Sequence, residues 1–564
     1  MFFLFERRTN NPPLQMRSRA LSGGYGGFLY GLEIAKLQPI SNGVVCVHEQ
    51  VANADCECPL YDGKGSMMSH TKRIITTDLA ENETAFRNMF STCDDVKYRK
   101  MKIGKHLKVT CLIAYIEVSL NNTMLESSAL GRMIAYLEQL PENEINHALN
   151  ENAVGLSDSA PIQTIEDAAM MLLTGSAILF VDGYAKALKI SDKGYPGLEV
   201  GESDTEKVVR GSDESFTESE KINTALIRKR IRSTRLKVKE FQVGLRSHTN
   251  VALVYIEDLA DKNLVKEAHE RLNAYEIDGV LDSGVMEQLG EDKWYSPFPQ
   301  FHSTRRPDRA AMSVLEGKIV ILVDNSPVAL LLPADLNSFL KTTDDYYNRF
   351  YMATFARLLR YVSAFFALTL PGLYLAVTNF HTQILPTPLL LSFQEARIGV
   401  PFPAALEVLL MELSFELLRE AGVRLPGAMG NTIGIVGGLI IGQSAVDANL
   451  VSPIVVIVVA FTALCSFAIP NEEFAFSFRI LKFYIIALSA WLGYFGFLVG
   501  LFSILIHLAR LKSFHMPYLT PFVDAKLNDY QDEKDSFVRF PLRLLWKRPI
   551  FANPNERTKL KKKD

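Results

Sequence analysis

Hydrophobic and polar positions divide this chain into two unlike parts. Residues 70–345 mix charged and apolar positions as a water-soluble protein does, whereas residues 351–511 are dominated by Leu, Ile, Val, Phe, Ala and Gly. In the first part, short β-branched runs alternate with segments of helical spacing, a pattern typical of α/β domains. In the second part, several apolar runs approach or exceed the ~20 residues that cross a bilayer core. The predicted fold class is therefore an α/β cytoplasmic region of two subdomains followed by an α-helical polytopic membrane domain.

The α/β part repeats its order of elements. A helix in "LAENETAFRNMF", a buried strand in "KVTCLIAYIE", a helix in "IEDAAMMLLTG" and a hairpin in "SAILFVDGYAKALKI", turning at Asp182-Gly183, come first. After a polar, turn-rich stretch, the strand "NVALVYIEDLA", an amphipathic helix and the hairpin "GKIVILVDNSPVALLLP" follow. Because the order recurs, we predict two related cytoplasmic subdomains, at residues 70–195 and 196–345.

Apolar runs predict the spans of the membrane domain, residues 346–515. Four spans fit the pattern: 357–379, 431–447, 451–469 and 479–511. The last run contains three glycines and exceeds one perpendicular span, so it is either one tilted helix or a broken one. The soluble part lacks an export signal and the end of the chain is rich in lysine, which favours the cytoplasm for both termini, so an even number of crossings follows. The remaining segments are an atypical, loosely ordered stretch at residues 1–69 and a basic cytoplasmic tail at residues 516–564.

One predicted helix of the membrane domain, at residues 402–421, carries charges that are costly in lipid. The stretch "PFPAALEVLLMELSFELLRE" supplies these candidate pore or interface residues: Glu407, Glu412, Glu416, Arg419 and Glu420. All of them except Glu407 fall within one helical arc of roughly 100°. This amphipathic arc requires a polar surface. That surface is either the headgroup layer, with the helix lying at the interface, or a water-filled path between subunits, where acidic groups attract cations.

The segment that follows this helix, "GNTIGIVGGLIIGQSAVDANL", combines small and polar residues. Small residues let membrane helices approach closely, so its glycines are candidate helix-packing or gating positions: Gly434, Gly437, Gly438 and Gly442. Asn431 and Gln443 add polar groups near its ends. These two are further candidates for the pore or interface, with ordinary packing and headgroup contact as the alternative.

Composition and motifs argue against several classes of function. A net charge of −3 creates no field that favours nucleic acid, and the basic stretch "RSTRLKVK" fits a solvated cytoplasmic face. The six cysteines are scattered, and the single C-x-C pair has no second pair to complete a zinc site. The sequence also lacks a P-loop, a G-x-S-x-G elbow and an H-E-x-x-H motif. We therefore expect no enzyme activity, no cofactor, no bound metal and no nucleic-acid partner.

Five stretches together carry a resemblance to a known family. They begin "VVRGSDESF", "AYEIDGVLDSG", "DDYYNRFY", "LPTPLLLSFQEARIGVPFP" and "VSPIVVIVVAF". In content and order they resemble the A subunits of the GerA-type spore germinant receptors, over about residues 75–520. Residues 1–69 and those after about 525 depart from the pattern. The resemblance implies a cytoplasmic region of two subdomains and a multi-pass membrane domain in the spore inner membrane.

The same resemblance implies partners and an activity. The partners are the lipid bilayer, a transporter-like B subunit that senses the nutrient, a lipoprotein C subunit, and further copies of this chain in a pentamer. The implied activity is a nutrient-gated ion channel that releases monovalent cations, in which Glu412 and Glu416 would meet protein or water instead of lipid. The alternative is a non-conducting membrane scaffold that assembles the B and C subunits. A secondary transporter is disfavoured because the spans show no obvious inverted repeat.

Overall fold

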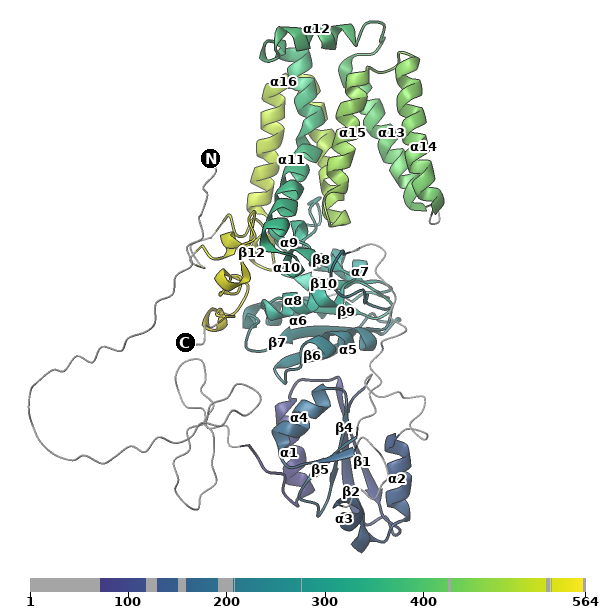
Figure 1. Cartoon of the computed structure of the whole chain (residues 1–564), viewed down its shortest axis with the longest axis vertical. Helices are drawn as coiled ribbons and strands as arrows, with labels where there is room; N and C mark the ends of the chain where they lie inside the picture. Colours follow the sequence, from purple (N-terminus) through teal and green to yellow (C-terminus); the bar gives the residue numbers. More distant parts are fainter. Residues whose placement is uncertain are drawn as a thin grey trace, which may run out of the picture. The chain divides into compact units, whose positions relative to one another are not determined.

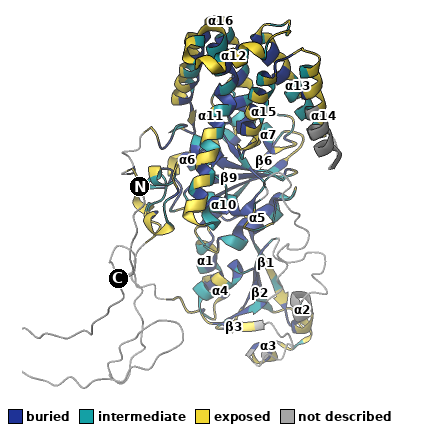
Figure 2. Cartoon of the chain, turned by 45° about the horizontal axis from the view of Figure 1, so that its top comes forward, coloured by how far each residue is buried: buried dark blue, intermediate teal, exposed yellow. Residues whose placement is uncertain are grey.

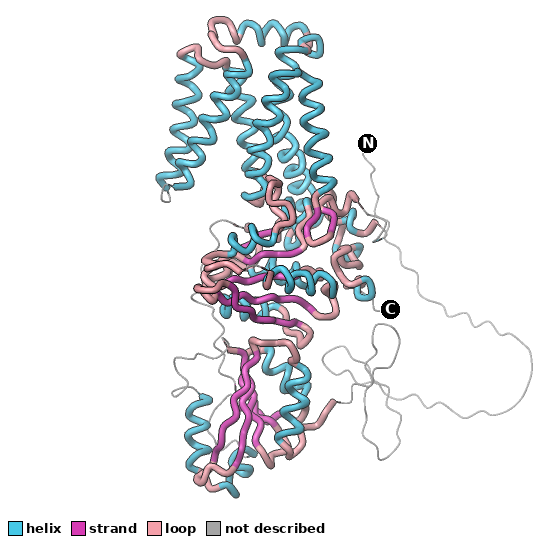
Figure 3. Tube along the Cα trace, turned by 180° about the vertical axis from the view of Figure 1, so that it is seen from behind, coloured by secondary structure: helices cyan, strands magenta, loops and turns pink. Residues whose placement is uncertain are grey.

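The computed structural model describes residues 72–117, 129–150, 159–190, 206, 208–274, 276–424, 428–523, 528 and 530–560. Within these residues, two β-sheets with their helices come first in the chain and a bundle of long helices follows (Figure 1). Figure 3 shows the same separation, with the long helices apart from the strands of the two sheets. The predicted fold class is confirmed. The predicted N-terminal segment, residues 1–69, lies outside the described residues.

The first subdomain is a five-stranded antiparallel sheet with helices on both faces. Its elements are α1 (Leu79–Met89), β1 (Val96–Ile103), β2 (Val109–Ile116), α2 (Ala129–Gln139), α3 (Glu142–Asn150), β3 (Ser159–Ile162), α4 (Ile165–Leu173), β4 (Ala177–Val181) and β5 (Ala187–Ile190). The strand order is β1-β2-β4-β5-β3. Successive residues of a strand point to opposite faces, so Leu112 and Phe180 pack under α1 and α4, while Cys111 and Leu179 pack under α2 and α3.

The second subdomain repeats this arrangement element by element. It contains α5 (Glu220–Arg230), β6 (Leu236–Val243), β7 (Thr249–Ile256), α6 (Lys262–Leu272), α7 (Ser283–Gly290), β8 (His302–Thr304), α8 (Pro307–Leu315), β9 (Ile319–Val323) and β10 (Ala329–Leu332). Its strand order is β6-β7-β9-β10-β8, the same order as in the first sheet. Helices α5 and α8 cover one face, and α6 and α7 cover the other.

The repetition extends to individual hydrogen bonds. Before α1, the amide of Thr76 donates to Asn82 Oδ1 at 3.0 Å, and Asn82 Nδ2 donates to the Thr76 carbonyl at 2.6 Å. Before α5, Thr217 and Asn223 make the same two bonds at 2.7 and 2.6 Å. A buried asparagine thus fixes the entry to the first helix of each subdomain, and the internal repeat inferred from the sequence is present in the structure.

A bundle of helices follows, introduced by α9 (Leu336–Leu340) and α10 (Asp344–Tyr347). It contains α11 (Phe350–Phe380), the 3-10 turn η2 (Thr382–Ile384), α12 (Thr387–Glu395), α13 (Ala404–Arg424), α14 (Ala428–Asp447), α15 (Pro453–Phe467) and α16 (Glu472–Arg510). Among the described residues, α11 and α16 have the length and apolarity to cross a membrane, and α15 is a shorter apolar helix. Exposed residues line the outer sides of these helices (Figure 2), and large apolar side chains such as Phe355 and Phe365 are among them.

The helix α16 consists of two arms that reverse direction at Gly493. This residue has a non-helical backbone, with φ 62° and ψ −139°. Ser503 Oγ lies 3.2 Å from the Tyr484 hydroxyl, although a straight helix would separate two residues at this spacing by about 28 Å. Phe474, near the start of α16, and His507, near its end, both lie beside Phe298, at ring-centroid distances of 6.0 and 6.1 Å.

This reversal changes the predicted number of spans. The predicted span 479–511 is a helical hairpin, because Gly493 accepts a positive φ and a Cβ there would lie only 2.7 Å from Phe380 Cγ. The helix α13, predicted at residues 402–421 and not counted as a span, packs against α14 and α15. Within the described part of the chain, the bundle therefore has six long helical segments where the sequence predicted four spans. The number is still even, so the two ends of the bundle still lie on one side.

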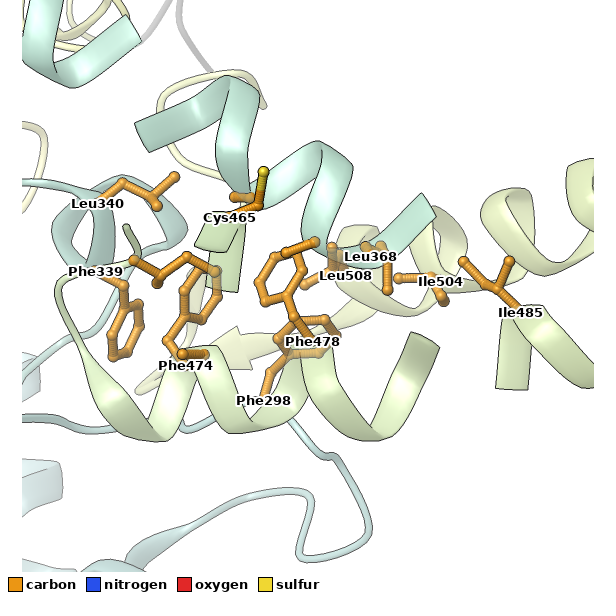
Figure 4. Close-up of a cluster of buried hydrophobic side chains, with 14 of the residues drawn as sticks. Phe298, Phe339, Leu340, Leu368, Cys465, Phe474, Phe478, Ile485, Ile504 and Leu508 are labelled. Carbon is orange, nitrogen blue, oxygen red and sulfur yellow. The ribbon is translucent and has the colours of Figure 1, made fainter. Parts of the chain in front are cut away.

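One apolar cluster joins the second subdomain to the base of the bundle (Figure 4). Phe339 of α9 stacks on Phe474 of α16, with ring centroids 5.0 Å apart and an interplanar angle of 11°. Phe298, from the loop before β8, Leu368 of α11 and Leu508 of the second arm of α16 belong to the same cluster. Because packed interiors transmit displacement, a shift of either arm of α16 must move or strain the second subdomain.

The chain beyond the bundle folds back onto the second subdomain. Its short elements are β11 (Lys512–Ser513), β12 (Met516–Pro517) and the 3-10 turns η4 (Asp532–Lys534), η5 (Leu542–Leu544) and η6 (Pro554–Glu556). The Leu336 amide donates to the Tyr518 carbonyl at 2.9 Å, and the Asn553 amide donates to the Leu259 carbonyl at 2.7 Å. The sequence predicted a basic tail at residues 516–564. The described part of that tail is ordered, because backbone hydrogen bonds and buried apolar side chains such as Phe551 hold it.

Candidate functional site

Two carboxylates of α13 pair with two cations on the first arm of α16. Lys482 Nζ lies 2.5 Å from Glu412 Oε2 and 2.9 Å from Glu416 Oε1. Arg479 Nη1 lies 3.4 Å from Glu416 Oε2. The side chains of Glu412 and Lys482 are only 2% and 5% exposed. We call these four residues the α13–α16 charge network, and its inner pair is closed off from water.

Helical spacing explains why the four side chains meet. Residues four apart on one helix and three apart on another each lie on a single face, as Glu412 and Glu416 do on α13 and Arg479 and Lys482 do on α16. The network contains two charges of each sign and is neutral overall. Removing charges from water costs several kcal/mol per ion, so such pairs persist only where close contacts offset that cost.

The network lies about halfway along the bundle. Lys482 precedes the turn at Gly493 by eleven residues, or about 16 Å at 1.5 Å per residue. That distance is roughly half of a 30 Å hydrocarbon core. Glu412 Oε1 is also buried and has no hydrogen-bond partner among the described residues. A polar atom of this kind, deep within an apolar bundle, can accept a hydrogen bond from a water molecule.

Glu407 has a separate position on α13. Its side chain is fully buried, and it accepts a 2.8 Å hydrogen bond from the amide of Ser452, the residue that caps α15. Arg397 Nη2 lies 3.3 Å from its other oxygen. A carboxylate at a helix N-terminus is stabilised by the helix dipole. Glu407 thus ties α13 to α15, apart from the charge network, in line with its predicted position outside the charged arc.

The remaining charges of the predicted arc have other partners. Arg419 Nη1 lies 3.3 Å from Ser466 Oγ, and its guanidinium is 4.5 Å from the Phe467 ring centroid. Glu420 pairs with Arg424 at 2.6 Å on the exposed surface of α13. The arc therefore meets no single polar surface: buried Glu412 and half-buried Glu416 pair with α16, Arg419 reaches α15, and Glu420 is exposed.

The candidate packing, gating and pore residues of α14 have different surroundings. A Cβ at Gly437 would lie 2.9 Å from Leu418 Cδ2, which shows that α13 and α14 approach closely there. Gly442 faces Val456 of α15 at an ordinary contact distance, whereas a Cβ at Gly438 would meet nothing within 4 Å. Gln443 is exposed. The side chain of Asn431 and the surroundings of Gly434 lie outside what the structure describes, so roles for these two remain predictions.

Sequence reasoning missed the cationic half of the network. The signal was present in "RILKFY", where Arg479 and Lys482 stand three apart at the start of an apolar run. Their spacing complements that of Glu412 and Glu416. Two intramembrane charges of each sign, on one helical face each, could therefore have been matched from the sequence.

A second cluster of charges anchors the base of α11. Arg357 is fully buried, with Nη1 2.9 Å from Asp535 Oδ1 and Nε 3.2 Å from Asp345 Oδ2. Lys341 Nζ lies 3.0 Å from Asp535, and the Tyr346 hydroxyl donates to it at 2.6 Å. Burial acts to raise the pKa of Asp535, but Lys341, Arg357 and Tyr346 hold that pKa well below its ordinary value. This cluster fastens α11 to the C-terminal segment.

Comparison with known proteins gives matches over most of the chain. The model of a family described as Bacillus/Clostridium GerA spore germination protein matches residues 84–551. "Uncharacterized membrane protein YfkQ" of Bacillus subtilis (strain 168) is 39% identical over 495 residues, which cover 87% of this chain and 95% of that protein. "Spore germination protein B1" of the same organism is 37% identical, covering 86% of this chain and 99% of that protein.

Among solved structures, the N-terminal domain of the A subunit of the Bacillus megaterium spore germinant receptor GerK3 is 29% identical. It covers 46% of this chain and 97% of its own, with a TM-score of 0.37.

The family match through residue 551 also corrects one expectation from the sequence. Residues after about 525 were expected to depart from the family pattern, but the matched region includes the C-terminal segment as far as residue 551.

Proposed function

Because the chain belongs to the GerA family of spore germination proteins, we propose that it is the A subunit of a nutrient germinant receptor and forms a gated cation channel. The role in spore germination follows from the family. The proposed assembly is a pentamer of this chain in the spore inner membrane, with a transporter-like B subunit and a lipoprotein C subunit. The observation that carries the channel proposal is the α13–α16 charge network at about half the depth of the bundle.

Charged side chains inside a membrane are costly and mark ion pathways or relays. In the present arrangement, Lys482 neutralises Glu412 and Glu416, so these carboxylates are unavailable to a mobile cation. Separation of α13 from the first arm of α16 would leave two carboxylates per subunit facing the space between the helices. Repeated around a closed oligomer, they would form an acidic ring, the arrangement that attracts cations into a pore.

Opening the network has an energetic cost that a gate must overcome. Leaving a buried charge without its partner costs about 3–5 kcal/mol, so parting the two helices before water reaches the charges is unfavourable by a similar amount. To move a two-state equilibrium from 1:99 to 99:1, a ligand must favour one state by about 5.5 kcal/mol, and nutrient binding elsewhere in the receptor would supply that preference. Differential contacts in the two states are what such a population shift requires.

Potassium flux from vesicles tests this proposal. The full chain, alone and with the B and C subunits, is reconstituted with internal potassium, and leak is compared for the wild type and Glu412→Gln. The matched control is Glu420→Gln on the same helix, because that carboxylate is exposed and its ion-pair partner is Arg424, outside the charge network. We expect Glu412→Gln to change the leak rate or the preference for potassium over chloride, and Glu420→Gln to change neither. Equal conduction by intact oligomers of all three proteins would refute a role for the network in the ion path.

The competing proposal is a scaffold that conducts nothing and holds the B and C subunits. The apolar cluster at the base of the bundle supports it, since it fixes both arms of α16 to the second subdomain. The same proteins distinguish the two proposals. A scaffold predicts that Glu412→Gln alters the amount of B and C subunit that co-purifies, with no potassium leak from any of the vesicles that contain the assembled receptor and nutrient.

A further inference from the structure

Exposed aromatic and apolar side chains surround the base of the bundle. Trp294 and Tyr295 belong to the loop between α7 and β8 and are 83% and 61% exposed. The exposed apolar side chains of the C-terminal segment include Phe522, Val523, Phe537 and Val538. We call these six residues the membrane-facing rim. Exposed clusters of this kind, next to an apolar bundle, mark a contact surface rather than ordinary solvent-facing structure.

The uncharged part of α11 gives the position of the rim relative to the hydrocarbon core of the bilayer. Residues 361–380 contain no charged side chain, and twenty helical residues span about 30 Å, the thickness of a hydrocarbon core. Tyr361 therefore marks the inner boundary of that core. The ring of Phe537 lies 4.5 Å from the ring of Tyr361, and the Thr354 hydroxyl, two turns earlier, donates to the Arg539 carbonyl at 3.2 Å. Phe537 thus lies at the boundary between hydrocarbon and headgroups.

The second arm of α16 places Trp294 and Tyr295 at the same boundary of the hydrocarbon core. His507 and Arg510 end its apolar run. The ring of Tyr295 lies 6.3 Å from that of His507, and Trp294 packs edge-on against Tyr295 at 6.0 Å. Lys293 Nζ donates to the Arg510 carbonyl at 2.9 Å, which fixes this loop to the end of the arm. Both halves of the rim therefore lie where helices of the bundle leave the apolar layer.

The chemistry of the rim fits lipid headgroups. Tryptophan and tyrosine favour membrane–water interfaces, because an apolar ring and a polar group share one side chain. Arg510, whose carbonyl binds Lys293, and Lys512, two residues later, are exposed, and basic residues near a cytoplasmic leaflet attract anionic lipids. We propose that the rim inserts into the anionic headgroup layer of the cytoplasmic leaflet, so that the second subdomain rests on the membrane surface. This inference depends on the proposed insertion of the bundle in a bilayer.

Tryptophan fluorescence tests the rim in the full chain. The sequence has three tryptophans, Trp294, Trp491 and Trp546. In nanodiscs of phosphatidylcholine and phosphatidylglycerol, acyl chains brominated close to the headgroup quench a nearby indole. One protein keeps Trp294 alone, and a second keeps Trp491 alone, which is 77% exposed beside the turn of α16 and reports insertion of the bundle. Two more carry Val538→Trp or Met170→Trp without the native tryptophans. Met170 is an exposed residue of α4 in the first subdomain and serves as the control.

The expected result is a blue-shifted and quenched emission for Trp294, Trp491 and the Val538→Trp protein, and neither change for the Met170→Trp protein. If Trp491 is quenched but both rim positions remain unquenched, the rim inference is wrong while insertion of the bundle stands. A blue shift of the rim positions without quenching would mean that protein, either a second copy or a partner subunit, covers the rim, and would also overturn it. If Trp491 itself is unquenched, the proposed insertion fails.

Discussion

Substituting Lys482 tests the energetics of the α13–α16 charge network. Lys482→Met keeps the length and apolar stem of the side chain but removes the ammonium group that lies 2.5 Å from Glu412. Glu412 then has no ion-pair partner among the described residues, whereas Glu416 retains Arg479 at 3.4 Å. Removing one partner of a buried pair costs about 3–5 kcal/mol, because the other charge is left uncompensated. We expect a loss of unfolding free energy within that range.

Two further variants separate the ion pair from the packing. In Lys482→Met with Glu412→Leu, both buried charges are gone, and replacing a whole buried pair by apolar side chains is often neutral or stabilising by about 1–4 kcal/mol. The double variant should therefore recover most of the loss. Arg424→Met breaks the exposed pair with Glu420 on the same helix, which should cost only about 0.3–0.5 kcal/mol.

Reversible unfolding of the full chain in mixed micelles, followed by helical circular dichroism, measures all of these variants. With Glu412→Leu alone as the second single variant, a double-mutant cycle then gives the coupling between Lys482 and Glu412 directly. The reasoning is refuted if Lys482→Met costs no more than Arg424→Met. It is equally refuted if the losses of the two single variants simply add in the double variant, since that would mean the side chains do not interact.

Three other substitutions, one of them with a matched control, have defined outcomes in thermal unfolding. Gly493→Ala should destabilise by more than ~1 kcal/mol, because φ is positive and the methyl group meets an aromatic ring, whereas Gly438→Ala, with open space around it, should not. Asp535→Asn should cost about 3–5 kcal/mol at neutral pH. Because the pKa of Asp535 is held low, its contribution is lost as the pH falls below the ordinary 3.8, and the variant should lose less stability than the wild type there. Burial raises the pKa of Glu220 from 4.5 to about 7, so stability falls as the pH rises between these values, and Glu220→Gln should flatten that slope; an unchanged slope would contradict this assignment.

Buried strands and tight turns could be predicted from local sequence. The strand expected at residues 108–117 is β2, Val109–Ile116, and the turn expected at Asp182-Gly183 joins β4 to β5. Edge strands were harder to predict from the sequence, because their exposed positions carry charged residues. The basic stretch "RSTRLKVK" was interpreted as a solvated face, yet it runs into β6, and Lys237 within it is buried and donates to the Ser91 carbonyl at 2.8 Å. Local periodicity cannot predict a hydrogen-bond partner 146 positions away in the chain.

Only the acidic half of the candidate site, on α13, could be predicted from the sequence. Periodicity on α13 identified Glu412 and Glu416 as neighbours, but their binding partners depend on which helix packs against α13. That choice is made by tertiary packing, which places the first arm of α16 against α13. The reversal that ends this arm at Gly493 was equally hard to predict. An apolar run with several glycines gives no indication of which glycine takes a positive φ, because the reversal is decided by packing against Phe380.

The cluster at the base of α11 has a consequence for biosynthesis. Arg357 and Asp535 are separated by 178 positions in the chain, and at roughly 5–20 residues per second a ribosome needs about 10–35 s to make that stretch. During this time Arg357 lacks one of the carboxylates that will surround it. Asp535 thus completes the base of α11 only after every helix of the bundle has been synthesised.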